Sequence, residues 1–188
     1  PTVEYEGQVY NTIQIFSQCW LKENLNVGEM IPGTMEQSNN GTIEKYCYNN
    51  EPDSCIKYGG LYQWNEMMQY ATQQGVQGIC PPGWHIPTDE EWKVLEKFQG
   101  MSQDQADASG WRGTTEGGEL KEAGTAHWTS PNTGATNETD FTALPGGYRN
   151  IDGQYAEMGA SGFWWSSTDY NTANSWNRKI LNSSDKTF

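Results

Sequence analysis

The chain has 188 residues and a net charge of −13, because 24 acidic side chains oppose 11 basic ones. This charge argues against nucleic acid and anionic membranes as partners, since their phosphate groups would repel the chain. Leu, Ile, Val and Phe supply only 26 residues, a share typical of disorder, but nine Trp and ten Tyr can build a core instead. We therefore expect one folded domain over residues 1–188, of an extracellular type and without a membrane-spanning segment.

The first part of the chain combines a hairpin, a long loop and a helix. Alternating apolar residues between Val3 and Ile15, interrupted by a Glu-Gly turn, predict a hairpin that leads into a longer strand. Residues 26–60 are rich in Asn, Gly and Pro without a sustained period, so we expect mostly loop. Apolar residues at three- and four-residue intervals then predict a helix over Leu61–Gln74.

A second helix has a clear start signal. Thr88 and Glu91 have the T-x-x-E spacing of a capping box, and the acidic residues 89–91 suit the positive end of the helix dipole. This helix-start chemistry accounts for the acidic triplet without a metal ion. The apolar residues on one face of the helix are Trp92, Leu95 and Phe98.

The rest of the chain is irregular before it returns to strands. Residues 100–140 are polar and Gly-rich, which predicts a long loop with a short helix near Gly118–Ala123. Strand-like segments separated by Gly, Asn and Asp turns follow at Phe141–Arg149, Gly162–Thr168 and Asn174–Leu181. The sequence therefore predicts a loop-rich α+β domain with two helices and a β-rich carboxyl half.

The four cysteines are Cys19, Cys47, Cys55 and Cys80. None of them forms a C-x-x-C pair, which argues against a zinc ribbon or a thioredoxin-type site. Because Cys47 and Cys55 flank a turn-rich stretch, we expect a disulfide between them, with two buried thiols as the alternative. Whether Cys19 and Cys80 pair is left open. A disulfide favours an oxidising compartment, so we expect a secreted or cell-surface protein.

Five ordered motifs together resemble one family. They are QCWLKENLN at 18–26, YCYNN through YGGLYQW at 46–64, ICPPGWHIPT followed by EW at 79–92, FTALPGGYR followed by DG at 141–153, and FWWSST at 163–168. The pattern resembles the Fibrobacter succinogenes major paralogous domain (FISUMP), which occurs in secreted and surface proteins of Bacteroidota and Fibrobacterota. The resemblance implies a C-type-lectin-like fold, in which two helices flank a small twisted antiparallel sheet with long irregular loops.

The end of the sequence departs from the family pattern. Family members typically continue to a final strand that reads like G-x-S-V-R-C, whereas this sequence stops at Phe188. By the resemblance, the missing cysteine is the partner of Cys80 or Cys19, so one or both are expected to be unpaired. We expect a chain that lacks this last strand and leaves an open sheet edge.

The resemblance also implies where a ligand binds, because C-type-lectin-like folds use the loops above the carboxyl-terminal strands. The candidate ligand-binding residues there are Tyr148, Arg149, Trp165, Tyr170, Trp176 and Arg178. Aromatic rings stack on the apolar faces of sugars, while Asn, Asp and Arg bond hydroxyl groups. We therefore expect a non-catalytic extracellular binding or adhesion module for a glycan or a surface protein. The alternative is a structural subunit of a surface filament or a multi-domain secreted assembly, which self-assembles through the open edge.

The tryptophans divide into two groups by their place in the motifs. Those expected in the core are Trp20, Trp64, Trp84, Trp92 and Trp164. Those expected in the later loops and strands, where such folds meet ligands, are Trp111, Trp128, Trp165 and Trp176.

Catalysis and cofactors find little support in the sequence. His85 and His127 are the only histidines, and H-E-x-x-H, G-x-S-x-G and phosphate-binding glycine loops are missing. Paired carboxylates for glycoside hydrolysis stay open, because their separation is a three-dimensional property. Glu51-Pro52-Asp53 resembles the sugar-binding E-P-x tripeptide of calcium-dependent lectins, but its residues already suit a turn. We expect no metal and no cofactor, with Ca²⁺ on the acidic loops as the alternative.

Overall fold

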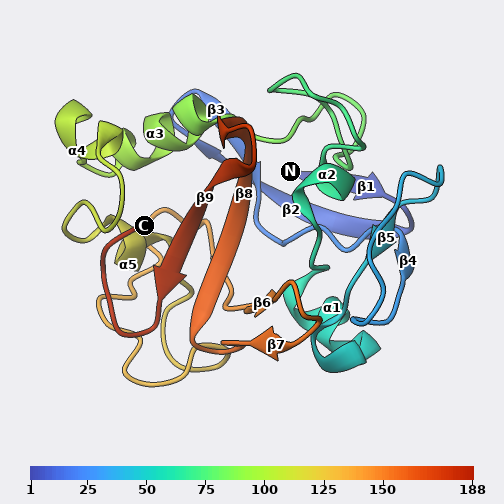
Figure 1. Ribbon diagram of the computed structural model, residues 1–188. Coiled ribbons are helices and arrows are strands. Elements are labelled where there is room, and N and C mark those ends of the chain that lie inside the picture. The colour runs from blue at the N-terminus through green and yellow to red at the C-terminus, as the bar shows by residue number, and fades with distance from the viewer.

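A three-stranded antiparallel sheet opens the chain. The computed structural model describes residues 1–188, and its first strands are β1 (Thr2–Tyr5), β2 (Gln8–Ile15) and β3 (Gln18–Leu21), paired in that order (Figure 1). Glu6 and Phe16 take positive φ angles of 49° and 52° in the two tight turns. The predicted hairpin and longer strand are therefore confirmed, with β3 added beyond them.

The region expected to be mostly loop contains a disulfide-linked helix. Two short parallel strands, β4 (Glu29–Met30) and β5 (Glu44–Lys45), precede a 3-10 turn η1 (Tyr48–Asn50) and helix α1 (Pro52–Tyr58). Pro52 lies in the first turn of α1, where its missing N–H costs nothing. The expected Cys47–Cys55 disulfide is confirmed and ties α1 to the preceding turn.

The helix predicted over Leu61–Gln74 is wrong in extent. Only α2 (Trp64–Met67) is helical, because Gln69 and Tyr70 adopt left-handed φ angles of 49° and 60° that end it. The apolar stripe is nevertheless used for packing. Met67 and Met68 are buried in a small core cluster with Val27, Ile79, Cys80 and Ile86.

Helix α3 (Asp89–Phe98) begins as the sequence predicts. Thr88 Oγ1 accepts from the backbone N–H of Glu91 at 3.2 Å, and a Glu91 carboxylate oxygen accepts from the N–H of Thr88 at 2.8 Å, which completes the capping box. Trp92 and Leu95 are buried as expected. Phe98 corrects the expected apolar face, since it is 56% exposed and stacks on Phe16 at the protein surface.

The expected total of two helices is also wrong. Besides α1, α2 and α3, the chain forms α4 (Gln103–Asp107) and α5 (Glu116–Leu120), of which only α5 lies near a predicted helix. All of them are short, and none has the length and apolar character needed to cross a membrane. The domain is therefore α+β, but with five small helices set among long connections.

The carboxyl half contains two antiparallel hairpins. The strand predicted over Phe141–Arg149 is reduced to β6 (Tyr148–Arg149), paired with β7 (Tyr155–Ala156), because Pro145 and two glycines interrupt it. The other two predicted strands are confirmed as β8 (Ser161–Asn171) and β9 (Asn174–Leu181). In Figure 1 this long hairpin runs through the middle of the molecule, between α3–α5 on one side and β4, β5 and α1 on the other.

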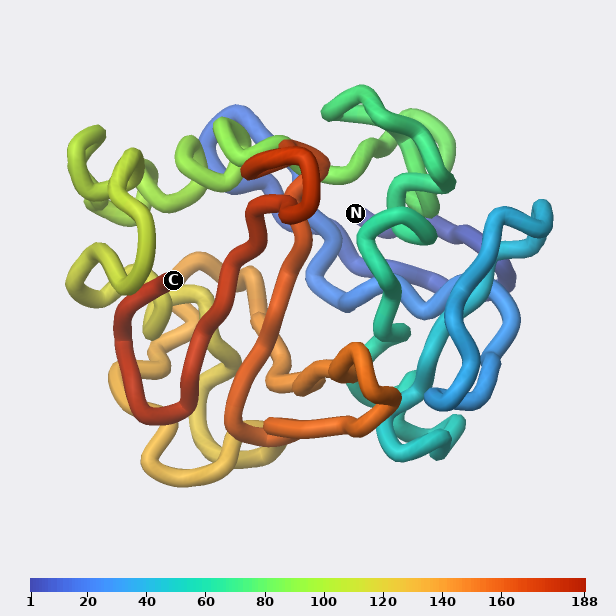
Figure 2. Tube along the Cα trace, viewed as in Figure 1, coloured from blue at the N-terminus to red at the C-terminus, as the bar shows by residue number.

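The outer edge of β9 is not fully open. Figure 2 shows the last residues looping back beside β9, where Phe188 and Lys179 exchange two backbone hydrogen bonds of 3.0 and 3.1 Å. Thr187 bridges both Ile180 and Arg112. The expectation of an open edge here is therefore corrected for this part of β9.

The larger core cluster lies between α3, α5 and the two main sheets. Its buried members are Ile15, Trp92, Leu95, Leu120, Trp128, Phe141, Ala143 and Ile180. Trp128 corrects the expected division of the tryptophans, because it is 1% exposed and its indole N–H donates to the carbonyl of Ala143. Sequence position had assigned Trp128 to the loops.

Candidate functional site

The tip of the β8–β9 hairpin carries an aromatic pair, of which Tyr170 is exposed and Trp176 is half-buried. We call residues 169–176 the hairpin tip. Tyr170 and Trp176 meet edge to face at 4.8 Å, and Tyr170 is 59% exposed. The turn between the strands is ordered by the side-chain oxygen of Asn171, which accepts from the N–H of Ala173 at 2.9 Å and from the Asn174 amide at 3.0 Å. The aromatic surface is thus flanked by amide side chains and held by local hydrogen bonds.

Trp165 on β8 and Tyr148 on β6 lie outside the hairpin tip. The Trp165 indole is partly exposed and donates to the carbonyl of Tyr62 at 3.0 Å. Tyr148 packs edge to face on Phe163, with 5.2 Å between ring centroids. Both candidate rings line a cavity, and neither makes an aromatic contact with Tyr170 or Trp176.

The guanidinium of Arg149 is already engaged inside the protein. It lies 4.3 Å from the ring centroid of Tyr46, donates to the carbonyl of Gly33 at 2.7 Å, and pairs with Glu36 at 2.7 Å. Through this pair Arg149 holds the pKa of Glu36 below its usual value. Arg149 therefore joins β6 to the loop before β5.

Arg178 corrects the expectation of a ligand-facing side chain. It is 2% exposed and forms ion pairs with Asp89 at 2.7 Å and Glu96 at 2.8 Å. Glu96 also pairs with Arg112 at 2.9 Å. The physical reason is strand alternation: Arg178 lies opposite Trp164 and points towards α3, whereas its neighbours Asn177 and Lys179 point to the other face.

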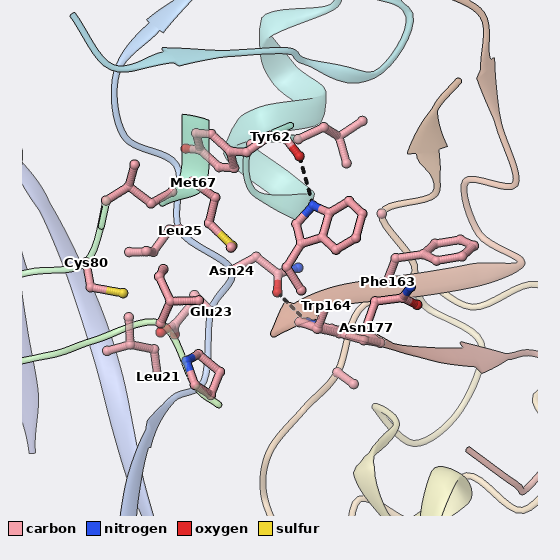
Figure 3. Close-up of a pocket in the computed structure, with 18 of the residues that line it drawn as sticks. Leu21, Glu23, Asn24, Leu25, Tyr62, Met67, Cys80, Phe163, Trp164 and Asn177 are labelled. Atoms are coloured by element: carbon pink, nitrogen blue, oxygen red, sulfur yellow. Dashed lines mark hydrogen bonds between the residues drawn. The ribbon is translucent and has the colours of Figure 1, made fainter. Parts of the chain in front are cut away.

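A large cavity of about 1320 Å³ opens between β3 with the chain that follows it and the β8–β9 hairpin. We call it the central groove. Figure 3 shows Leu21, Leu25 and Met67 on one side and Phe163 and Trp164 on the other. Tyr148, Arg149 and Trp165 also line the central groove, whereas Tyr170 and Trp176 do not. The structure thus divides the six candidates between the central groove, the hairpin tip and the core.

Sequence reasoning missed Asn24, which spans the central groove. Its side-chain oxygen accepts from the Trp164 indole at 2.9 Å (Figure 3), and its amide donates to the carbonyl of Tyr58 at 2.8 Å. Asn24 lies in the W-x-x-E-N-L-N motif, which offered a signal for a structural role. The amides of the hairpin tip carried no comparable signal, because the chain is rich in Asn throughout.

The titratable groups near these surfaces are mostly paired. His85 faces Glu91 at 2.8 Å, and His127 faces Glu122 at 2.8 Å. Cys80 is buried, which raises the pKa of its thiol to about 12, while the unpaired Cys19 is exposed. Groups of three or more His, Cys, Asp or Glu side chains that could hold a metal ion are not found.

The fold and these surfaces define a disulfide-bonded α+β domain with an exposed aromatic contact surface. The chain belongs to the Fibrobacter succinogenes major domain family, whose model matches residues 13–187. The resemblance of the five sequence motifs is thereby confirmed. Neither the curated proteins nor the solved structures contain a match to this chain.

Proposed function

We propose that this domain is a non-catalytic extracellular binding module with a C-type-lectin-like fold, and that it recognises a glycan through the hairpin tip. The observation that carries the proposal is the Tyr170–Trp176 pair, in which Tyr170 is exposed and Trp176 half-buried, beside the amides of Asn171 and Asn174. Aromatic faces bind the apolar faces of sugar rings, and neighbouring amides bond their hydroxyl groups.

The charge of the protein narrows the class of glycan. The net charge is −13, the tip carries Asp169, and the nearest candidate cation, Arg178, is buried in its own ion pairs. An anionic glycan would be repelled, because summed like charge raises a potential barrier at the surface. A neutral oligosaccharide is therefore the ligand class that fits the hairpin tip.

Two further observations support the proposal. The Cys47–Cys55 disulfide is consistent with an extracellular location, since such bonds persist in oxidising compartments. Each histidine faces a carboxylate of its own and lies outside residues 169–176, so the proposed contact surface contains no histidine.

Binding to an array of neutral plant and host polysaccharides tests the proposal. We expect binding by the natural protein and a loss of roughly tenfold or more in affinity for Tyr170→Ala, because a stacking contact of about 1.4 kcal/mol is lost. Tyr170→Phe keeps the ring and should bind nearly normally. Ile56→Ala is the matched control, since Ile56 is 77% exposed on α1, away from the tip.

Two results would overturn the proposal. One is the absence of binding above background across neutral glycans. The other is an unchanged affinity for Tyr170→Ala and Trp176→Ala, which would place the contact surface elsewhere.

A further inference from the structure

The outer edge of β3 has backbone groups without partners. Lys22 donates its N–H to the carbonyl of Asn11 at 2.9 Å, and Trp20 lies opposite Ile13 in the same register. In an antiparallel pair, alternate residues exchange hydrogen bonds with the neighbouring strand. The residues between them, Cys19 and Leu21, therefore point their N–H and C=O groups away from β2, and no backbone partner meets them there.

The edge of β8 that faces away from β9 is open in the same way. Ser161 donates to the carbonyl of Glu157 and accepts from the N–H of Gly147, both at 2.9 Å, so its backbone faces away from β9. Phe163 follows two residues later and has the same orientation, but it has no partner on this side. Trp165, two residues after Phe163, has the same orientation, and its carbonyl accepts only from the Trp92 indole N–H, at 3.3 Å.

These unpaired groups belong to the walls of the central groove. Its volume of about 1320 Å³ exceeds the roughly 300–1,000 Å³ of ordinary small-molecule pockets, and more than half of its lining residues are hydrophobic. The central groove therefore combines unpaired backbone groups with apolar side chains. A strand that enters a sheet supplies both complements at once.

The charges of the central groove indicate an uncharged occupant. Lys22 pairs with Asp140 at 3.1 Å, Arg149 with Glu36, and Glu91 with His85. The lining cations are thus neutralised by the protein itself, and the carboxylate of Glu23, which has no cation partner, accepts from the backbone N–H and the side-chain amide of Asn11, both at 2.7 Å. The indoles of Trp164 and Trp165 are also bonded internally. The unpaired polar atoms of the central groove are therefore the backbone groups described above, together with the indole N–H of Trp20 and the side-chain oxygen of Gln18.

The spacing of these groups favours a peptide over a glycan. Cys19 and Leu21 lie two residues apart on one strand edge, which places their N–H groups about 6.6–6.8 Å apart. A peptide backbone repeats its donors and acceptors at that spacing, whereas the hydroxyl groups of a glycan do not. Alternate side chains of the same peptide would meet the apolar wall.

We propose that the central groove binds an extended, uncharged segment of a different protein, which adds as a β-strand to the free edge of β3 and buries alternate apolar side chains against Leu25 and Phe163. Of the hairpin-tip residues, Asn174 also lines the central groove, whereas Tyr170 and Trp176 do not. The central groove makes the domain an acceptor of a partner strand, independently of any glycan bound by Tyr170.

The test tethers a strand to the groove and measures amide hydrogen exchange by NMR. A short peptide of alternating valine and threonine, with blocked ends and one pyridyl disulfide, is coupled to the exposed Cys19. The Cys19 thiolate forms the mixed disulfide, and pyridine-2-thiol leaves with the displaced electron pair. Tethering gives the peptide a high effective concentration, and Cys80→Ala removes the second thiol from the reaction.

Backbone pairing predicts a pattern that alternates along β3. Exchange of the Leu21 amide should slow by tenfold or more, while the Trp20 amide, already paired with Ile13, should not change. The matched control is the same peptide with N-methyl groups on alternate residues, which keeps the side chains but removes the pairing donors. It should leave Leu21 unprotected.

Four outcomes would overturn the proposal. The first is exchange of the Leu21 amide that is equally fast with and without the peptide. The second is equal protection by both peptides, which would show side-chain burial alone. Protection of Leu21 by soluble cello-oligosaccharides would identify a glycan groove. The same protection on self-association of the untethered protein would identify a second copy as the occupant. Tyr170→Ala should alter none of these results, which separates this test from that of the hairpin tip.

Discussion

The arginines show how one residue type can serve the fold where a ligand contact is expected. Arg178 is buried with Asp89 and Glu96, and the pair ties β9 to α3. Removal of one partner leaves a buried charge without compensation, which is far more costly than the loss of a surface ion pair. At the residue scale, this ion-pair network is the strongest candidate for a stability determinant.

We predict that Arg178→Met lowers the free energy of unfolding by about 3–5 kcal/mol. Urea denaturation of the natural protein and the variant measures the difference. Lys179→Met is the matched control, because Lys179 is the next residue on β9 but only half-buried, with a 3.2 Å pair to Glu157. Equal losses for the two variants would contradict the role of the buried network.

Lys121 is a buried amine that the sequence did not single out. It is fully buried, and its Nζ donates to the carbonyls of Thr133 at 2.7 Å, Leu181 at 3.0 Å and Ser184 at 2.9 Å. Burial lowers the pKa of Lys121 to about 8 from its ordinary 10.5. Three segments of the carboxyl half are thus joined by one ammonium group.

This pKa sets the sign of a pH effect on stability. Between pH 8 and 10.5 the unfolded chain binds more protons at Lys121 than the folded chain, so the contribution of Lys121 to the free energy of unfolding rises with pH. We predict that the natural protein gains stability relative to Lys121→Met between pH about 7 and about 9.5. Urea denaturation at both pH values measures it, and parallel curves for the two proteins would refute it.

At the scale of elements, α3 depends on its capping box. We predict that Thr88→Ala lowers the free energy of unfolding by about 1 kcal/mol, because the N–H of Glu91 loses its acceptor. Thr172→Ala, in the exposed hairpin turn, is the control and should have almost no effect. Thermal unfolding of the two variants compares them, and similar melting temperatures would argue against the capping role.

The disulfide is the second feature that acts on an element. It closes a short loop around η1 and the start of α1. We predict that replacing both Cys47 and Cys55 by Ser costs about 2.5 kcal/mol, mainly because the unfolded chain gains freedom. Urea denaturation checks this value. A loss below about 0.5 kcal/mol would mean that the bond restrains little in the unfolded chain.

Elements whose signals are local could be predicted, and the others could not. The capping box of Thr88 and Glu91, the Cys47–Cys55 bond and the β8–β9 strands all depend on residues close in sequence. The prediction of a helix over Leu61–Gln74 was wrong because Gln69 and Tyr70 adopt left-handed φ angles that end the helix. Neither Gln nor Tyr is a residue type that favours this conformation. The apolar spacing correctly predicted that Met67 and Met68 are buried, but it did not predict the length of the helix.

The candidate site was predicted in part for the same reason. Tyr170 lies near the end of β8, two residues before the hairpin turn, so its exposure follows from local sequence. Trp128 and Arg178 were assigned to ligand-facing positions, but both are buried against segments far away in the chain. Burial of an individual ring or guanidinium is a tertiary property, and periodicity within a strand cannot establish which face meets the core.

At the scale of the whole molecule, the β8–β9 hairpin connects the two surfaces proposed here. Its base packs against both core clusters through Ile180 and the Trp64 indole, which donates to the carbonyl of Ser166 at 2.8 Å. Its tip carries the exposed Tyr170 and the half-buried Trp176. A rigid base with an exposed aromatic residue at its tip is suited to binding, because the fold already orders the tip and a ligand then loses less free energy to conformational ordering.

An NMR titration of the labelled protein with neutral cellulose-, xylan- and mannan-derived oligosaccharides tests the central claim most directly. The account predicts that amide shifts perturbed by a bound oligosaccharide cluster at residues 169–176, and that Tyr170→Ala abolishes them while Ile56→Ala does not. Perturbations confined to other surfaces, or no saturable shift with any of these oligosaccharides, would contradict it.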